Sequence, residues 1–257
     1  MRHPLNSKQL KFGAGVPCNH ALVSARFHSV PAIDHRLAKN LRNIDRYSPT
    51  WDHICMHLST SQAATELGVT ARQVRRAVVS GRIAATKYGT SHAISQRQVQ
   101  ALERTAHRGR NWTDAVQKAA LDLLATGKTT ELSSTERSRL KHRVRSLDVG
   151  ALAGQVLRGR VSLRRAASDE AKSRFVSVLA SELGLSAGGG LGVLVAHDAS
   201  RAARRSRLGL DDSGDIAVVE GDEVHRRVLE ALALYTYGDA RECSAATQWI
   251  TSAQEAV

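Results

Sequence analysis

The stretch "AATELGVTARQVRRAVVSGRI", from Ala63 to Ile83, combines four arginines with regularly spaced apolar residues. Two capping boxes, "STSQ" at 59–62 and "TARQ" at 70–73, predict the starts of two short helices, because each hydroxyl and amide bonds a free backbone N–H group. Gly68 falls where a tight turn needs an unusual backbone, and we expect Val69 to pack between the helices. The second helix should extend to about Ser80 and end at Gly81. This pattern predicts a helix–turn–helix.

The second helix has two different faces when its residues are placed about 100° apart. Its inward face comprises Ala71, Val74, Ala77 and Val78. Its outward face comprises Arg72, Gln73, Arg76 and Ser80, with Arg75 on the flank. A helix that enters the DNA major groove needs long donors on its outer face, since arginine can bond guanine and glutamine can bond adenine through two hydrogen bonds.

The residues that follow predict a β-wing and a third helix. "RIAATKYGTSHAIS", at 82–95, is typical of two short strands around a turn at Gly89–Thr90. "SQRQ", at 95–98, is a third capping box that should begin a helix through Val99 and Leu102. The predicted order is helix, turn, helix, wing, helix.

The chain divides into four predicted parts. Residues 1–55 contain all four prolines and no sustained periodicity, which favours a disordered basic leader. Met56 is a candidate start that would make this leader non-native; the alternative is a genuine basic arm lying along DNA. Residues 56–104 form the winged helix–turn–helix, 105–111 a polar linker, and 112–257 a helical, α+β regulatory or toxin-antagonising domain.

Within the last part we expect more helix than strand. The expected helices are near 113–126, 134–146, 148–158, 169–183 (capped by Ser168), 222–237 and 240–253 (capped by Asp239), and the expected strands are 160–165, "LGVLVAH" at 191–197 and "DIAVVE" at 215–220. The box "SSTE" should begin the helix at 134. The fold class is therefore mainly α (α+β): a winged helix–turn–helix, a helical middle region and a small C-terminal α/β segment.

The positive charge is concentrated beside the opening stretch. The net charge is +13, and residues 56–110 hold nine Lys/Arg against two Asp/Glu, whereas residues 111–257 hold 20 against 19. Such a segment favours an anionic partner. Aromatic residues are only 4% of the chain, which argues against stacking on single strands and favours duplex DNA. Without a signal peptide or a membrane-length apolar run, we expect a cytoplasmic, nucleoid-associated protein with no membrane partner.

"LSTSQAATELGVTARQVRRAVVSGRI" and the wing "AATKYGTSHAIS" together resemble the MerR/excisionase-like winged helix–turn–helix family. The resemblance implies that the second helix enters the major groove and that the wing touches the DNA backbone. The implied base-edge contacts are Arg72, Gln73 and Arg76. The implied phosphate or wing contacts are Thr60, Ser61, Thr70, Arg75, Arg82, Lys87, Tyr88 and His92. One such module binds modestly, so a homodimer or two half-sites is expected.

A second resemblance covers about residues 57–253. The linker opening on "RNWT", the basic "LKHRVRSL" and the ending "LEALALYTYGDARECSAATQWI" look like bacterial antitoxins of AbiE-type systems, which are encoded beside nucleotidyltransferase toxins. This resemblance implies an autorepressing transcriptional regulator whose C-terminal region opposes a cognate nucleotidyltransferase toxin. The alternative is a stand-alone MerR/excisionase-like regulator whose C-terminal region dimerises or senses an effector.

No catalytic or metal-binding pattern emerges from the sequence. "SAGGGLGVLV" lacks the spacing of a phosphate-binding loop, and "DDSGD", at 211–215, lacks the glycine and glutamate of a calcium loop, so we expect a turn between a helix and a strand there. The cysteines Cys18, Cys55 and Cys243 are scattered, which favours reduced thiols. We therefore expect no enzyme, no metal and no cofactor.

Overall fold

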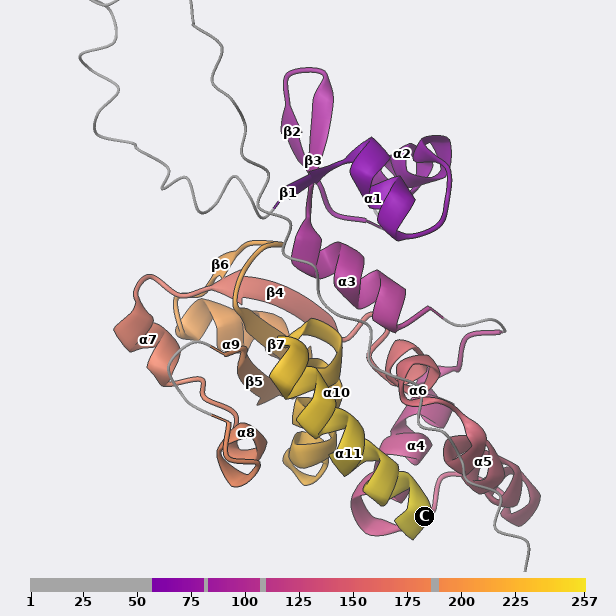
Figure 1. Cartoon of the computed structure of the whole chain (residues 1–257). Coiled ribbons are helices and arrows are strands. Elements are labelled where there is room, and N and C mark those ends of the chain that lie inside the picture. The colour runs from indigo at the N-terminus through magenta and orange to yellow at the C-terminus, as the bar shows by residue number, and fades with distance from the viewer. Residues whose placement is uncertain (1–56, 81–82, 107–109, 186–189) are drawn as a thin grey trace, which may run out of the picture. The chain divides into compact units, whose positions relative to one another are not determined.

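The computed structural model describes residues 57–80, 83–106, 110–185 and 190–257. The predictions for the leader 1–55, for Gly81 and Arg82, for Cys18 and Cys55, and for part of the linker lie outside the described residues. Both helices and small sheets are present, and helices account for more residues than strands (Figure 1). The mixed α and β content expected from the sequence is thus confirmed. No helix among the described residues is both long and apolar enough to cross a membrane.

The first group of elements runs from residue 57 to 104. It consists of β1 (His57–Ser59), α1 (Thr60–Glu66), α2 (Ala71–Val79), β2 (Thr86–Tyr88), β3 (Ser91–Ser95) and α3 (Gln96–Arg104). The three strands form an antiparallel sheet in the order β1-β3-β2. The sequence predicted β2 and β3 but not β1. Buried apolar side chains join the helices to this sheet. They are Ala63, Ala64, Val74, Ile83, Ile94 and Val99.

Two of the three capping boxes in this group are confirmed. Ser59 and Thr70 each accept a bond from the backbone N–H three residues later, and the glutamine there bonds back to the capping residue. The third prediction is wrong: Ser95 makes no capping bond. Ser95 is buried as the last residue of β3, where it pairs with His57, and the Gln98 amide faces the backbone of Ala84 instead.

The turn between α1 and α2 differs from the expectation at one residue. Gly68 has a φ of +63°, as a left-handed turn residue should, and Val69 N donates to Ala64 O at 3.0 Å. Val69 itself is 41% exposed, so the prediction that it packs between the helices is wrong. The buried core of this group is formed by other residues, including Ala63 and Val74, and the turn is closed by backbone bonds.

The second group of elements begins with three helices that pack with the last two. Its elements are α4 (Asp114–Thr126), α5 (Ser134–Ser146), α6 (Val149–Val156), β4 (Val161–Arg165), α7 (Asp169–Ser173), α8 (Val178–Glu182), β5 (Gly192–Ala196), α9 (Ala199–Arg205), β6 (Gly209–Leu210), β7 (Ile216–Glu220), the 3₁₀ helix η2 (Glu223–His225), α10 (Arg226–Tyr237) and α11 (Ala240–Ala256). The predicted caps Ser133, Ser168 and Asp239 are confirmed.

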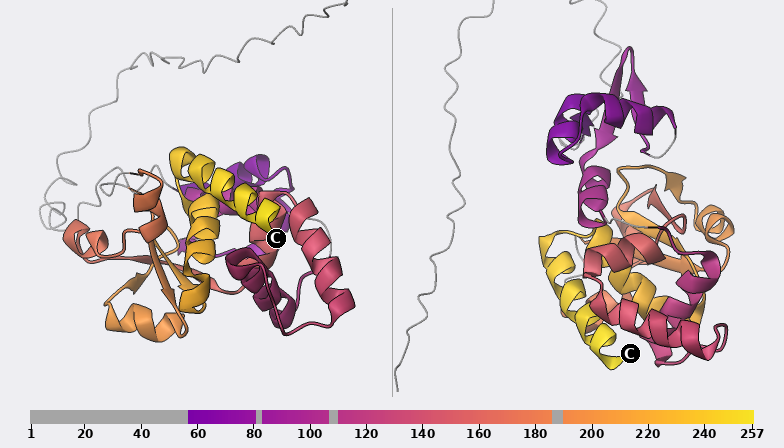
Figure 2. Two further views of the ribbon diagram at one scale, coloured as in Figure 1. Left: turned by 90° about the horizontal axis from the view of Figure 1, so that it is seen from below. Right: turned by 90° about the vertical axis from the view of Figure 1, so that its right-hand side faces the viewer.

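A mixed sheet with the strand order β5-β7-β4-β6 forms the centre of this group. β5 and β7 are parallel, and α9 lies between them along the chain, whereas the other pairs are antiparallel. Side chains alternate along β7: Ala217 and Val219 join the core with α10, and Ile216 and Val218 join a second core with α9. α10 and α9 therefore cover opposite faces of the sheet (Figure 2).

The expected helix at 169–183 is wrong, because α7 and α8 are separate. Between them, Val176 forms a β-bridge with Gly192, and Val193 N donates to Phe175 O. The Ser177 hydroxyl then caps α8 and donates to the buried Glu230 at 2.8 Å. These long-range contacts interrupt a segment whose local pattern is helical. The sequence also did not predict α9 or β6, so "DDSGD" joins two strands rather than a helix and a strand.

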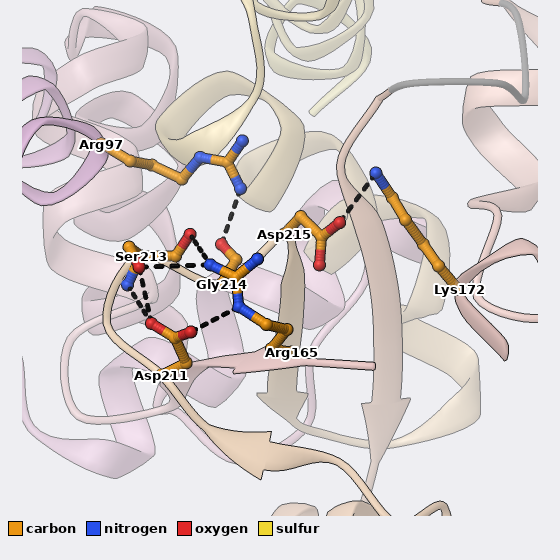
Figure 3. Close-up of polar contacts among 7 residues, drawn as sticks. All are labelled: Arg97, Arg165, Lys172, Asp211, Ser213, Gly214 and Asp215. Carbon is orange, nitrogen blue, oxygen red and sulfur yellow. Dashed lines mark hydrogen bonds and ion pairs between the residues drawn. The ribbon is translucent and has the colours of Figure 1, made fainter. Parts of the chain in front are cut away.

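α3 connects the two groups, which belong to one compact unit. At its C-terminal end, Arg104 Nη1 donates to the carbonyls of Tyr235, Thr236 and Gly238 at 3.1, 3.3 and 2.8 Å, which are acceptors at the end of α10. At its N-terminal end, Arg97 Nη1 donates to Gly214 O at 2.6 Å (Figure 3). α3 is thus bound to the second group at both ends.

Candidate nucleic-acid interface

The position of α2 follows from its own sequence. The Thr70 hydroxyl accepts from Gln73 N at 3.3 Å and begins the helix, and Val74, only 1% exposed, anchors it on the core of the first group. The partly buried Ala71, Ala77 and Val78 pack around the same core. The predicted inward face of α2 is confirmed.

The opposite face of α2 is exposed and basic. Arg72, Arg75 and Arg76 are all exposed, as are Gln73 and Ser80. None of the three guanidinium groups forms a salt bridge with a carboxylate of the described residues. Three guanidinium groups on one short helix, none paired with a carboxylate of the described residues, can bind phosphates or the edges of guanine bases.

Gln73 has a second role besides the predicted base recognition, because its side chain also takes part in the capping box of α2. Its Oε1 accepts from Thr70 N at 2.8 Å and from the Thr70 hydroxyl at 3.0 Å. Because recognition of adenine through two bonds needs both the amide oxygen and the amide nitrogen, Gln73 could bind adenine in that way only by breaking the cap. In this conformation only its NH₂ group is free to donate.

The candidate residues at the helix N-termini are arranged unequally. Ser61 is exposed, with its hydroxyl 3.0 Å from that of Ser59, whereas Thr60 is half-buried. The Thr70 hydroxyl is exposed but is used by the Gln73 cap. Of these three, Ser61 is the one whose side chain is most accessible to a ligand.

The β2–β3 hairpin carries the remaining candidates that the structure describes. Lys87 and Tyr88 on β2 are exposed, Tyr88 by 65%. His92 lies directly opposite Lys87 on β3 and is half-buried, and its buried Nδ1 has no hydrogen-bond partner within the ranges that the structure describes. Gly89, with a φ of +59°, allows the tight turn between the strands. Arg82 lies outside the described residues.

Two cations of this segment point away from the candidate interface. Arg97 and Arg104 bind carbonyl groups of the second group of elements, and burial lowers the pKa of the Arg97 guanidinium even though Asp215 and Glu242 act to raise it. Arg97 and Arg104 are seven residues apart, which places them on one face of α3. This spacing could have indicated from the sequence that both bind the same neighbouring part of the protein. The exposed positive charge of the segment is therefore concentrated on α2 and β2.

No group of three or more His, Cys, Asp or Glu side chains within the described ranges is arranged to bind a metal ion. Cys243, the described cysteine, is a free thiol. Comparison with family models, with curated proteins and with solved structures found no match to this chain.

Proposed function

We propose that residues 56–104 are a winged helix–turn–helix that binds duplex DNA and that the protein is a sequence-specific transcriptional regulator. One observation supports this function above the others: Arg72, Arg75 and Arg76 are exposed on the face of α2 opposite Val74, and none pairs with a carboxylate of the described residues. In this proposal α2 lies in the major groove and the β2–β3 hairpin lies along the backbone.

The candidate residues fall into two roles. Arg72 and Arg76 contact base edges, because the fork of the guanidinium group matches the two acceptors of guanine. Arg75, Lys87 and Ser61 contact phosphates, which positions α2 without reading sequence. Gln73 contributes its NH₂ group while its oxygen keeps the helix capped.

Binding of the protein to the DNA upstream of its own gene tests this function. We expect Arg72→Ala and Arg76→Ala each to weaken binding by about 1–3 kcal/mol and to relax specificity, and Lys87→Ala to weaken binding to all sequences alike. Electrophoretic mobility shifts with this fragment and with an unrelated duplex of equal length measure both effects. Parent-like binding by both arginine variants would show that α2 is not the reading helix.

We further propose that the regulator is an autorepressing antitoxin whose partner is a nucleotidyltransferase toxin opposed by residues 112–257. The resemblance in the order of the segments from "RNWT" to "SAATQWI" supports this role. A nucleotidyltransferase gene directly beside this one, whose toxicity in bacterial culture is relieved by co-expression of this chain, is the expected result. Unrelieved toxicity would remove the antitoxin role and leave the DNA-binding role untouched.

A stand-alone regulator that senses an effector is the alternative, and one feature favours it. A cleft of about 630 Å³ lies between α3 and the second group of elements, lined by residues that include Leu102, Leu157 and Thr236. This volume is typical of small-molecule sites, and the buried Thr236 hydroxyl has no hydrogen-bond partner among the described residues. A metabolite that raises the melting temperature of the parent but not of Thr236→Val would support this alternative.

A further inference from the structure

α9 exposes four arginines on the far side of the sheet from α10. Ala203 and Leu208 are buried against Ile216 and Val218, which fixes the inward face of this short helix. Arg201, Arg204, Arg205 and Arg207 are all exposed. The first three lie at i, i+3 and i+4, so they share one side of the helix. We call these four residues the α9 arginine surface.

Some cations of the second group have acidic partners, whereas others, such as the exposed Lys128, Arg139 and Arg145, form no salt bridge with the described residues. Lys118, Arg226 and Arg227 pair with Glu131, Glu223 and Glu182. The α9 arginines form no salt bridge with any carboxylate of the described ranges.

Two acidic residues close to α9 in the fold or the sequence have partners of their own. The exposed Asp198, which begins the helix, accepts from Arg201 N at 2.8 Å through Oδ1 and so satisfies a backbone group. Asp222 contacts His197. The positive charge of the α9 arginine surface is therefore not neutralised by salt bridges within the described chain.

Two of the four arginines occupy positions that the helix itself disfavours. Arg201 lies in the first turn, which contains no acidic residue, and a cation there opposes the positive end of the helix dipole. Arg207 has a φ of +54°, and it is the one residue other than glycine with a positive φ among those described. It occupies the position after the helix where glycine is preferred, with Leu208 N bonded to Ala203 O. These two positions are therefore locally unfavourable for arginine.

We propose that the α9 arginine surface is a second DNA-binding site, which holds the phosphate backbone of duplex DNA without reading its sequence. This inference rests on the proposed function, which supplies duplex DNA as the polyanion. The surface adds phosphate contacts beyond those of α2, and these contacts raise the affinity for any duplex and increase its dependence on salt.

The composition of α9 favours a DNA backbone over other anionic partners. None of the exposed large apolar side chains of the described residues falls within 199–207. Apolar protein interfaces use apolar or aromatic anchors, a membrane surface takes side chains that insert, and single strands stack on aromatic rings, so of the protein partners only an acidic one would fit this surface. A phosphate backbone needs cations alone.

The test uses the full chain and a fluorescent 30-base-pair duplex of arbitrary sequence, with binding measured by anisotropy at several salt concentrations. We expect Arg201→Gln/Arg204→Gln to reduce the slope of log K against log [salt] by about 2, since each lost phosphate contact removes about 0.9. The matched control is Lys118→Gln/Arg227→Gln, which removes the same charge from two exposed cations that are paired with glutamates. This control should change the slope by less than half a unit.

Arg207→Gly provides a second, independent variant. Glycine suits the positive φ, so the melting temperature should rise while the affinity for the duplex falls several-fold. A variant that is more stable and yet binds more weakly cannot be explained by misfolding. Equal affinity of Arg207→Gly and the parent, or equal salt slopes of the double variant and its control, would overturn the proposal.

The outcomes separate this inference from the proposed function. If Arg72→Gln/Arg76→Gln binds DNA like the parent while the α9 variants lose affinity, the assignment of α2 fails and the α9 surface stands. If only the α2 variant loses affinity, the reverse holds. If polyglutamate, but not duplex DNA, distinguishes the α9 variants from the parent, the surface binds an acidic protein and the DNA proposal is overturned.

Discussion

Gln73→Glu should separate the stability of α2 from its binding to DNA. The glutamine oxygen accepts from Thr70 N at 2.8 Å and from the Thr70 hydroxyl at 3.0 Å, and a glutamate oxygen can accept both bonds. A carboxylate in the first turn also interacts favourably with the helix dipole, by about 0.3–1 kcal/mol. We therefore expect the free energy of unfolding to stay the same or to rise slightly.

DNA binding should change in the opposite direction. A carboxylate about 6 Å from a phosphate, at an effective dielectric constant of about 40–80, costs about 0.7–1.4 kcal/mol by Coulomb's law. If one or two phosphates flank position 73, the affinity should fall by about one order of magnitude. The loss should be greatest at low salt, because screening weakens the repulsion.

Anisotropy titrations and urea unfolding of the same preparations measure the two effects. The matched control is Gln248→Glu, which makes the same charge change at an exposed position of α11 and should alter the affinity less than twofold. Unchanged affinity of Gln73→Glu at low salt would refute the placement of the N-terminal half of α2 against DNA.

Three further predictions concern stability. Thr70→Ala should lower the free energy of unfolding, measured by urea titration, by about 1 kcal/mol, as loss of a helix cap does. A loss smaller than about 0.3 kcal/mol would show that the Thr70 side chain does not stabilise α2 as a cap. Arg104→Gln should cost about 2–3 kcal/mol, because one charged group bonds three carbonyls at the end of α10, and a melting temperature equal to that of the parent would contradict this role. Burial acts to raise the pKa of Asp211, but hydrogen bonds from Arg165 and Ser213 outweigh burial and hold that pKa below its ordinary value. The ionised Asp211 therefore stabilises the folded protein above about pH 4, and this stabilisation is lost as the pH falls through the pKa of the folded state. Burial and the charge of Asp211 raise the pKa of Asp212, so the charge of Asp212 opposes folding at neutral pH. At pH 7, Asp211→Asn should therefore lower the free energy of unfolding and Asp212→Asn should raise it. Unfolding measured from pH 7 to pH 3 should show both variants approaching the parent, because the carboxylates become protonated.

Local sequence signals predicted the elements whose ends are determined by nearby residues. The boxes at Ser59, Thr70 and Ser133 satisfy backbone groups three residues away, and the inward face of α2 follows from helical periodicity alone. β5 and β7 were recognised as short apolar runs, which buried strands typically are.

Tertiary contacts determined the elements that the sequence pattern missed. The expected helix at 169–183 is interrupted because Val176 pairs with Gly192 and because Ser177 bonds Glu230, which is more than fifty residues away. Ser95 fails as a cap because β1 pairs with β3 there, and β1 had no local signal of its own.

At the candidate interface, the sequence predicted the exposed face of α2, but not that two other candidate residues, Thr60 and His92, are half-buried. The exposure of Arg72, Arg75 and Arg76 follows from their helical positions, and the structure agrees. The bonds between Thr70 and Gln73 were predicted as a capping box, whereas the bonds from Arg104 to the end of α10 join chain segments more than a hundred residues apart, which periodicity does not encode.

The most direct test of base reading by α2 keeps the charge and removes the shape of the guanidinium group. Arg72→Lys/Arg76→Lys retains both cations but loses the planar fork that bonds guanine through two hydrogen bonds. The measurement is the ratio of affinities for the DNA upstream of the gene and for an unrelated duplex of equal length, at one salt concentration. We expect the affinity for the unrelated duplex to change less than threefold while the preference for the upstream DNA falls by at least tenfold. A double variant that keeps the parent's preference would contradict the claim that α2 reads the operator.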